Sequence, residues 1–153
     1  MLESVKKFLK EIALGEQEKL PYQDDDYRVA AAALMFHIIA VDGDVEPEEL
    51  EALNKTLKNA YNLSDEETTN LVKLAEERDN EAVDLYGFTY VLKRQLSEED
   101  REKVIEMMWE MVFADGNVHE FEDNTIWRVA ELLGVSSRQR MLLKKQVGEK
   151  YNR

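Results

Sequence analysis

Apolar residues recur every three or four positions along almost the whole chain, which is the spacing of one face of an α-helix. No segment shows the strict alternation of apolar and polar residues that is typical of a β-strand. The run from Tyr27 to Val41 is apolar nearly all round, which indicates a central helix buried on every side. The pattern therefore predicts an all-α protein, a compact bundle of seven to eight helices.

Capping and turn residues divide this pattern into separate helices. The residues 64–67 have the order of a capping box, and Asn62 is a plausible left-handed stop for the helix before it. The predicted helices span residues 2–12, 27–41, 47–62 and 64 to about 78, followed by helices starting near 81, 97, 119 and 136. Residues 15–23 contain Gly15 and Pro21 and read as a linker. The expected organisation is an amphipathic helix with its linker at 1–23 and a helical domain at 24–153.

The chain contains an internal repeat. Residues 38–45 correspond to residues 111–118, and in each copy an apolar helix ends in an Asp-Gly turn. The correspondence continues to Glu49 and Glu122, and then to an apolar-Ser pair at 63–64 and 135–136. A single helix–turn–helix hairpin cannot bury its own apolar face, so the repeat predicts two hairpins packed about a pseudo-twofold axis.

The Asp-Gly turns admit two interpretations. In the structural one, the glycine ends a helix, and Glu49 and Glu122 lie three residues after an N-cap, where a glutamate closes a capping box. Asp42 and Asp115 stand at a helix C-terminus, which disfavours an anion, so they would either cap the following helix across the turn or help to bind a cation. In the functional one, the turns supply oxygen ligands to a hard divalent cation, Ca²⁺, Mg²⁺ or Mn²⁺.

The candidate metal ligands are acidic residues of the two turns. They are Asp42, Asp44, Glu49, Asp115 and Glu122. The turns are not EF-hands, because position six from Asp42 is Pro47 and position twelve is Leu53 where the EF-hand loop needs glycine and glutamate.

Composition excludes several classes of function. The chain of 153 residues has a net charge of −13, which argues against a nucleic-acid partner. It has no cysteine, which removes disulfides, thiol catalysis and cysteine-ligated metals. No apolar run is long enough to span a bilayer, and residues 1–15 do not resemble a targeting segment, so a cytoplasmic protein is expected. No Gly-rich phosphate loop or catalytic triad appears, so no enzyme is expected.

Other chemically interesting residues are expected to be structural. His37 lies in the apolar helix, where a hydrogen-bonded core histidine is the more common role. Trp109, Trp127 and the methionines at 107, 108 and 111 have helical spacing and are expected in the core.

The two ends of the chain differ from its acidic middle. Residues 138–153 carry six basic side chains and one acidic side chain, so this stretch has a charge of +5. It would dock an acidic partner or a second copy of the chain, or form a solvated helix with cations near its C-terminus. The stripe of Leu2, Val5, Phe8, Leu9 and Ile12 would contact a membrane surface, self-associate or pack back onto the core.

The paired turns, 40–43 with Glu49 and 114–116 with Glu122, resemble those of the TerB-like family, named after a tellurite-resistance protein. The stretches 84–89, 119–124 and 127–136 are similar to an uncharacterised proteobacterial branch of it, and the resemblance covers about residues 24–147. It implies an all-helical duplicated domain and a bacterial protein associated with stress or tellurite tolerance. It also implies a divalent cation on Asp42, Glu49, Asp115 and Glu122, and action beside membrane-associated stress proteins without catalysis.

Three functional hypotheses remain at this stage. The first is a binding module whose acidic turns take a cation and whose surface engages a protein partner. The second is a metal-free interaction scaffold that uses its terminal helices, with self-association left open. The third, an enzyme with paired carboxylates and a metal, requires Asp42 and Asp115 to share one pocket.

Overall fold

The protein is a bundle of helices in a computed structural model that describes residue 22 and residues 26–41, 43–114 and 118–151. Seven helices lie in this part of the chain, and it contains no strand. They are α2 (Tyr27–Ala40), α3 (Pro47–Tyr61), α4 (Asp65–Glu81), α5 (Tyr86–Gln95), α6 (Glu98–Ala114), α7 (Glu120–Leu132) and α8 (Ser137–Tyr151). The predicted all-α fold is confirmed, whereas the predicted helix at 2–12 lies outside the described residues.

Helix α2 is the centre of the bundle. Ten of its 14 residues are buried, among them Leu34, Met35 and Ile38 with no exposed surface. Helices α3, α4, α5, α6 and α7 all contact it. Each fully buried Leu, Met or Ile contributes roughly 1.5–3 kcal/mol from the hydrophobic effect, so the burial of most of α2 is a major source of stability. The prediction of a helix buried all round is confirmed.

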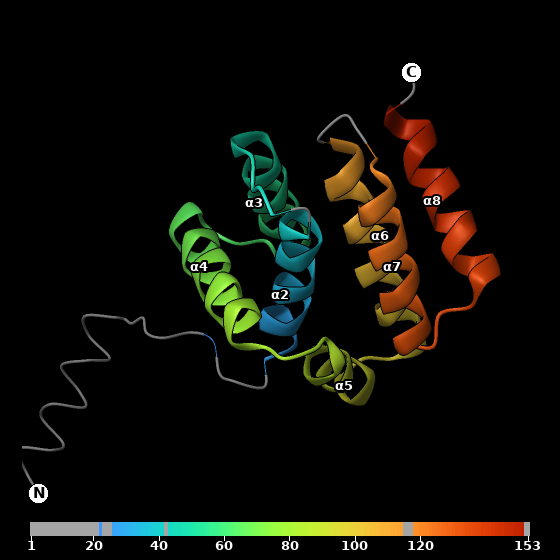
Figure 1. The fold of residues 1–153 in the computed structure, drawn as a ribbon, viewed down its shortest axis with the longest axis horizontal. Helices are drawn as coiled ribbons and strands as arrows, with labels where there is room; N and C mark the ends of the chain where they lie inside the picture. Colours follow the sequence, from blue (N-terminus) through green and yellow to red (C-terminus); the bar gives the residue numbers. More distant parts are fainter. Residues whose placement is uncertain (1–21, 23–25, 42, 115–117, 152–153) are drawn as a thin grey trace, which may run out of the picture.

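The helix packing reflects the sequence repeat. In the first half α2 packs against α3 and α4, and in the second half α6 packs against α7 and α8. Across the halves, α3 contacts α6 and α2 contacts α7, which is the exchange of partners that a pseudo-twofold relation requires. Helix α5 joins the halves at the end where α2 and α6 begin (Figure 1). Each repeated unit therefore contains three helices, whereas the predicted hairpin contained two.

The junctions after α3 and α7 are also equivalent. Asn62 has a φ of 55° and Gly134 a φ of 78°, so at both junctions the backbone adopts the left-handed conformation that commonly ends a helix. The next residue is buried and donates its N–H back into the helix, from Leu63 to Lys58 O at 3.0 Å and from Val135 to Ala130 O at 2.8 Å. The predicted stop at Asn62 is confirmed.

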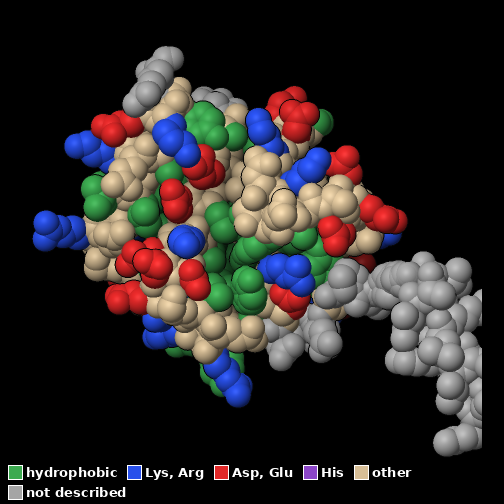
Figure 2. Space-filling model, turned by 180° about the vertical axis from the view of Figure 1, so that it is seen from behind, with side chains coloured by type: hydrophobic (Ala, Val, Ile, Leu, Met, Phe, Trp, Pro, Cys, Tyr) green, Lys and Arg blue, Asp and Glu red, His purple; other side chains and the backbone are tan. Residues whose placement is uncertain are grey.

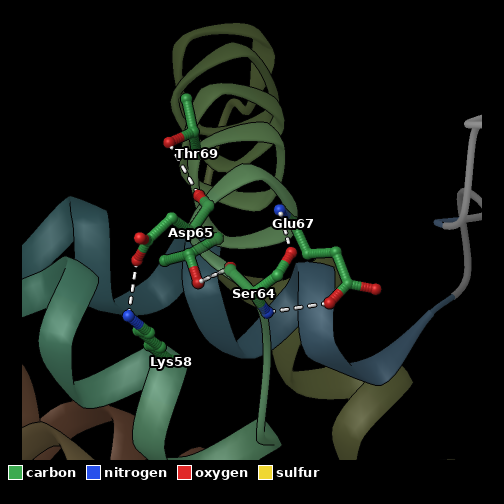
Figure 3. A network of polar contacts seen from close by, with 6 residues as sticks. Lys58, Ser64, Asp65, Glu67 and Thr69 are labelled. Carbon is green, nitrogen blue, oxygen red and sulfur yellow. Dashed lines mark hydrogen bonds and ion pairs between the residues drawn. The ribbon is translucent and has the colours of Figure 1, made fainter.

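A serine then opens the third helix of each half. Ser64 Oγ accepts from the Glu67 N–H at 3.1 Å, and Glu67 accepts from the Ser64 N–H at 2.8 Å, as Figure 3 shows. Ser136 Oγ likewise accepts from the Gln139 N–H at 3.1 Å. Both predicted caps are confirmed.

The start of the fifth helix was predicted incorrectly. Helix α4 continues to Glu81, and α5 begins only at Tyr86, whose N–H donates to Asp84 Oδ1 at 2.9 Å. Val83 lies in the connecting segment and is 99% exposed, not on an apolar helix face. The predicted start near residue 81 was wrong because the apolar residues before and after this segment keep helical spacing across it.

Two of the five cations of α8 pair with acidic side chains of neighbouring helices. Lys144 pairs with Asp123 of α7 at 2.9 Å, and Lys150 pairs with Glu110 of α6. Arg140 is buried, with its guanidinium 6.0 Å from the ring centre of Trp127. Part of the charge of the basic C-terminal stretch is therefore balanced by the acidic helices beside it, while Arg138 and Lys145 stay exposed.

No helix in the described ranges has both the length and the apolar character needed to cross a bilayer.

The left-handed turn at Gly134 yields a stability prediction. Gly134→Ala should lower the free energy of unfolding by about 1 kcal/mol, because a Cβ disfavours positive φ. Gly87→Ala should raise it by about 0.4–1 kcal/mol, since Gly87 lies in the first turn of α5 and no atom lies within 4 Å of the added Cβ. Urea unfolding of both variants measures the two signs, and equal shifts would contradict the assigned backbone conformations.

Candidate functional site

The first Asp-Gly turn joins α2 to α3. Gly43 has a φ of 91°, and its N–H donates to Ala40 O at 3.0 Å, which ends α2. The chain then runs exposed through Asp44 to Glu46, and Pro47 begins α3. Glycine and proline therefore have the structural roles predicted for them.

One glutamate after each turn is buried. Glu49 is 5% exposed and accepts from the Glu46 N–H at 2.8 Å. Glu122 is 3% exposed and accepts from the His119 N–H at 3.0 Å. Both lie at the third position of their helices, so the predicted capping role is confirmed for each.

Capping alone does not account for this burial. Glu67 closes a capping box with the same 2.8 Å bond and is exposed. Removing a carboxylate from water costs several kcal/mol unless other groups compensate for it. Glu49 and Glu122 therefore differ from Glu67 in being buried, and they share this burial at equivalent positions of the duplicated halves.

The other predicted ligands are placed only in part. Asp44 is exposed, whereas Asp42 and Asp115 lie outside the described residues. Among the residues described, no three acidic or histidine side chains form a group able to hold a metal. The C-terminal ends of α2 and α6 lie on the same side of the bundle (Figure 1). The grouping of Asp42, Asp44, Glu49, Asp115 and Glu122 stays a prediction.

Comparison with known proteins agrees with this duplicated helical architecture. The profile of a family described as "TerB: Tellurite resistance protein TerB" matches residues 28–145. The chain belongs to the TerB family. This confirms the resemblance found in the sequence, and the matched region contains both Asp-Gly turns.

A solved structure shares the fold of this TerB-family chain. It is a protein of unknown function, PG1108 from Porphyromonas gingivalis W83, with 13% identity and a TM-score of 0.62. The alignment covers 86% of this chain and 96% of the other. A search of curated proteins found no match.

Two single residues expected in the core have different positions in the TerB fold. His37 is half-buried at the surface of α2, and its Nδ1 lies 2.9 Å from Asp79 Oδ1 of α4. Trp127 is 42% exposed beside Arg140, so its predicted core position is wrong. Trp109, Met108 and Met111 are fully buried as predicted, and Met107 is partly buried against the core.

Sequence reasoning missed a groove between α3 and α6, which we call the α3–α6 groove. It encloses about 620 Å³, with Val104 and Met107 of α6 and Ala60 of α3 among its lining residues. Tyr27, Tyr61 and Tyr151 also line it. Helix α6 lies behind α7 in Figure 1, and the reverse view in Figure 2 shows a hollow with apolar side chains between charged ones.

The partly buried phenol of Tyr61 should lower the free energy of unfolding at high pH. Burial raises the pKa of Tyr61 above its ordinary value of 10.0, and the neighbouring Tyr27 adds to the shift. When the pKa of a tyrosine is higher in the folded protein than in the unfolded chain, its contribution to stability is fully present below the unfolded-state pKa. That contribution is lost as the pH rises from the unfolded-state pKa through the folded-state pKa. Burial raises the pKa of Tyr22 and Tyr151 in the same direction.

Tyr61→Phe should therefore flatten, without abolishing, the fall in unfolding free energy above about pH 10. Urea unfolding at a series of pH values measures the slope. Tyr90→Phe, at an exposed position on α5, is the matched control. An unchanged slope in Tyr61→Phe would contradict the assigned burial of this phenol.

Proposed function

We propose that this TerB-family protein is a non-enzymatic binding module associated with bacterial stress or tellurite tolerance. In this proposal its two Asp-Gly turns hold a divalent cation and its surface engages a protein partner. The observation that carries the proposal is the burial of Glu49 and Glu122 at equivalent helix starts, each directly after an acidic turn. Family membership supports the association with tellurite resistance.

The donor set favours a hard cation. Every candidate ligand, from Asp42, Asp44 and Glu49 to Asp115 and Glu122, supplies carboxylate oxygen. Such ligands suit Ca²⁺, Mg²⁺ or Mn²⁺, whereas zinc sites usually include imidazole or thiolate. A bound cation would offset the electrostatic cost of the two buried carboxylates. Asp42 and Asp115 would complete the site, because the described residues alone do not form a group of three.

The proposed partner is a protein, with membrane-associated stress proteins as the candidates that family membership suggests. The net charge of −13 disfavours nucleic acid. We place the protein in the cytoplasm and assign it no catalytic residues.

A metal-free scaffold that docks through its terminal helices is the second candidate. The basic residues of α8 are the feature that favours this scaffold, and Arg138 and Lys145 are exposed on that helix. However, Lys144 and Lys150 pair with Asp123 and Glu110 of the same chain. This internal pairing leaves α8 less charge for a partner.

Metal-dependent unfolding tests the proposal. Thermal unfolding of EDTA-stripped protein should show a saturable rise with one of Ca²⁺, Mg²⁺ or Mn²⁺. At about 100 times the dissociation constant the gain is about 2.7 kcal/mol, or roughly 5–10 °C for a chain of this size. Asp42→Asn with Asp115→Asn should abolish the rise.

Glutamine variants separate binding from capping. Glu49→Gln with Glu122→Gln keeps a side chain that can close a capping box but removes both charges, so the cation response should disappear while the fold remains. Glu67→Gln is the matched control, because this capping glutamate does not follow an Asp-Gly turn, and its response should equal that of the parent. No rise with any ion, or the same rise in all variants, would refute the cation site.

A further inference from the structure

We propose that residues 2–12 dock as an amphipathic helix in the α3–α6 groove of the same chain. This inference is independent of the cation site. The groove reaches Ala114 at the end of α6 but contains none of the five candidate metal ligands, and neither the repeat nor the family assignment gives it an occupant. Four observations support an occupant from the chain itself.

The groove leads to the place where the N-terminal segment joins the body. A second hollow, lined by Asp26, Arg28 and Asn62, shares Tyr27, Ala60 and Tyr61 with the α3–α6 groove. The two hollows therefore adjoin at these three residues, and together they make up a depression that extends from the first turn of α2 towards α6 and α8.

Tyr22 fixes the chain beside this depression. It is 8% exposed, and its hydroxyl donates to Glu67 O at 3.0 Å. The guanidinium of Arg28, which lines the second hollow, lies 4.8 Å from the ring centre of Tyr22. The segment that precedes Tyr22 thus starts from the end of the depression.

The segment is short and its tether is long enough to give it a wide reach. An 11-residue helix is about 16 Å long, and the residues between 12 and 22 span at most about 33 Å when extended. A short flexible tether gives an effective concentration in the millimolar range, so a site with a tenfold lower dissociation constant would be roughly nine-tenths occupied.

The chemistry of the two surfaces is complementary. The segment has an apolar stripe through Leu2, Val5, Leu9 and Ile12, and the groove offers the partly buried Met107 beside the exposed Ala60 and Ala114. An amphipathic helix binds such a groove through residues spaced three or four apart. Charges of both signs flank the stripe and line the groove. They are Glu3, Lys6, Lys7, Lys10 and Glu11 on the segment, and Lys55 and Glu106 around the groove, where Lys150 pairs with Glu110 and Lys103 with Asp100.

Distance measurements in the full chain test the proposal. Because the chain has no cysteine, Lys7→Cys and Glu51→Cys can carry one spin label each, on the polar side of the segment and on exposed α3. Double electron–electron resonance should then give one narrow distance distribution. Leu9→Asp on the stripe should broaden it, whereas Ser4→Asp adds the same charge off the stripe and should leave it narrow.

Two further variants identify the groove. Ala60→Arg fills the α3–α6 groove from an exposed position, so it should release the segment while the helical circular-dichroism signal stays unchanged. Val83→Arg obstructs a different apolar hollow, which Phe88 and Val91 of α5 also line, and should leave the distribution narrow.

Each remaining outcome overturns the proposal. A broad distribution in the parent means that the segment does not dock. If the distance distribution stays narrow in Ala60→Arg, the segment docks on another surface. The same conclusion holds if the distribution broadens only in Val83→Arg. A distance that disappears when labelled chains are diluted with unlabelled ones indicates docking on a second copy.

Discussion

The architecture depends on covering α2 from every side. A helix with an apolar surface all round is stable in water only when neighbours surround it, and ten of its 14 residues are buried. Helices α3 and α4 cover it from its own half, whereas α7 comes from the other half and α5 from the link between them. Neither half would therefore be complete without the other, which is the physical reason why the duplicated units pack together in one bundle.

The same duplication places a buried glutamate at the start of α3 and of α7. Glu49 and Glu122 each satisfy the N–H of the residue that precedes their helix, at 2.8 and 3.0 Å. An exposed glutamate performs this role equally well at Ser64. Capping therefore does not require burial, and the two buried carboxylates are the ones that follow the Asp-Gly turns. Their burial is the link between these helix caps and the proposed cation site.

The sequence predicted much of this fold because local rules and burial agreed. The apolar run of α2, the left-handed stop at Asn62 and the capping serines at 64 and 136 each correspond to an interaction in the structure. The start of α5 was wrong because helical spacing continues across the exposed segment around Val83. Groups brought together from distant elements, such as the pair of His37 with Asp79 and the α3–α6 groove, leave no mark in local spacing, so only the packing reveals them.

Paramagnetic broadening by Mn²⁺ tests most directly whether the acidic turns bind a cation. In ¹⁵N-labelled protein, substoichiometric Mn²⁺ should selectively broaden the amide signals of residues next to the turns, among them Asp44, Glu49, His119 and Glu122. The amides of the acidic stretch at Glu76 and Glu77 in α4 should stay sharp. Equal broadening at both places, or none at the turns, would contradict the account, because the cation would then respond to general negative charge and not to the duplicated turns.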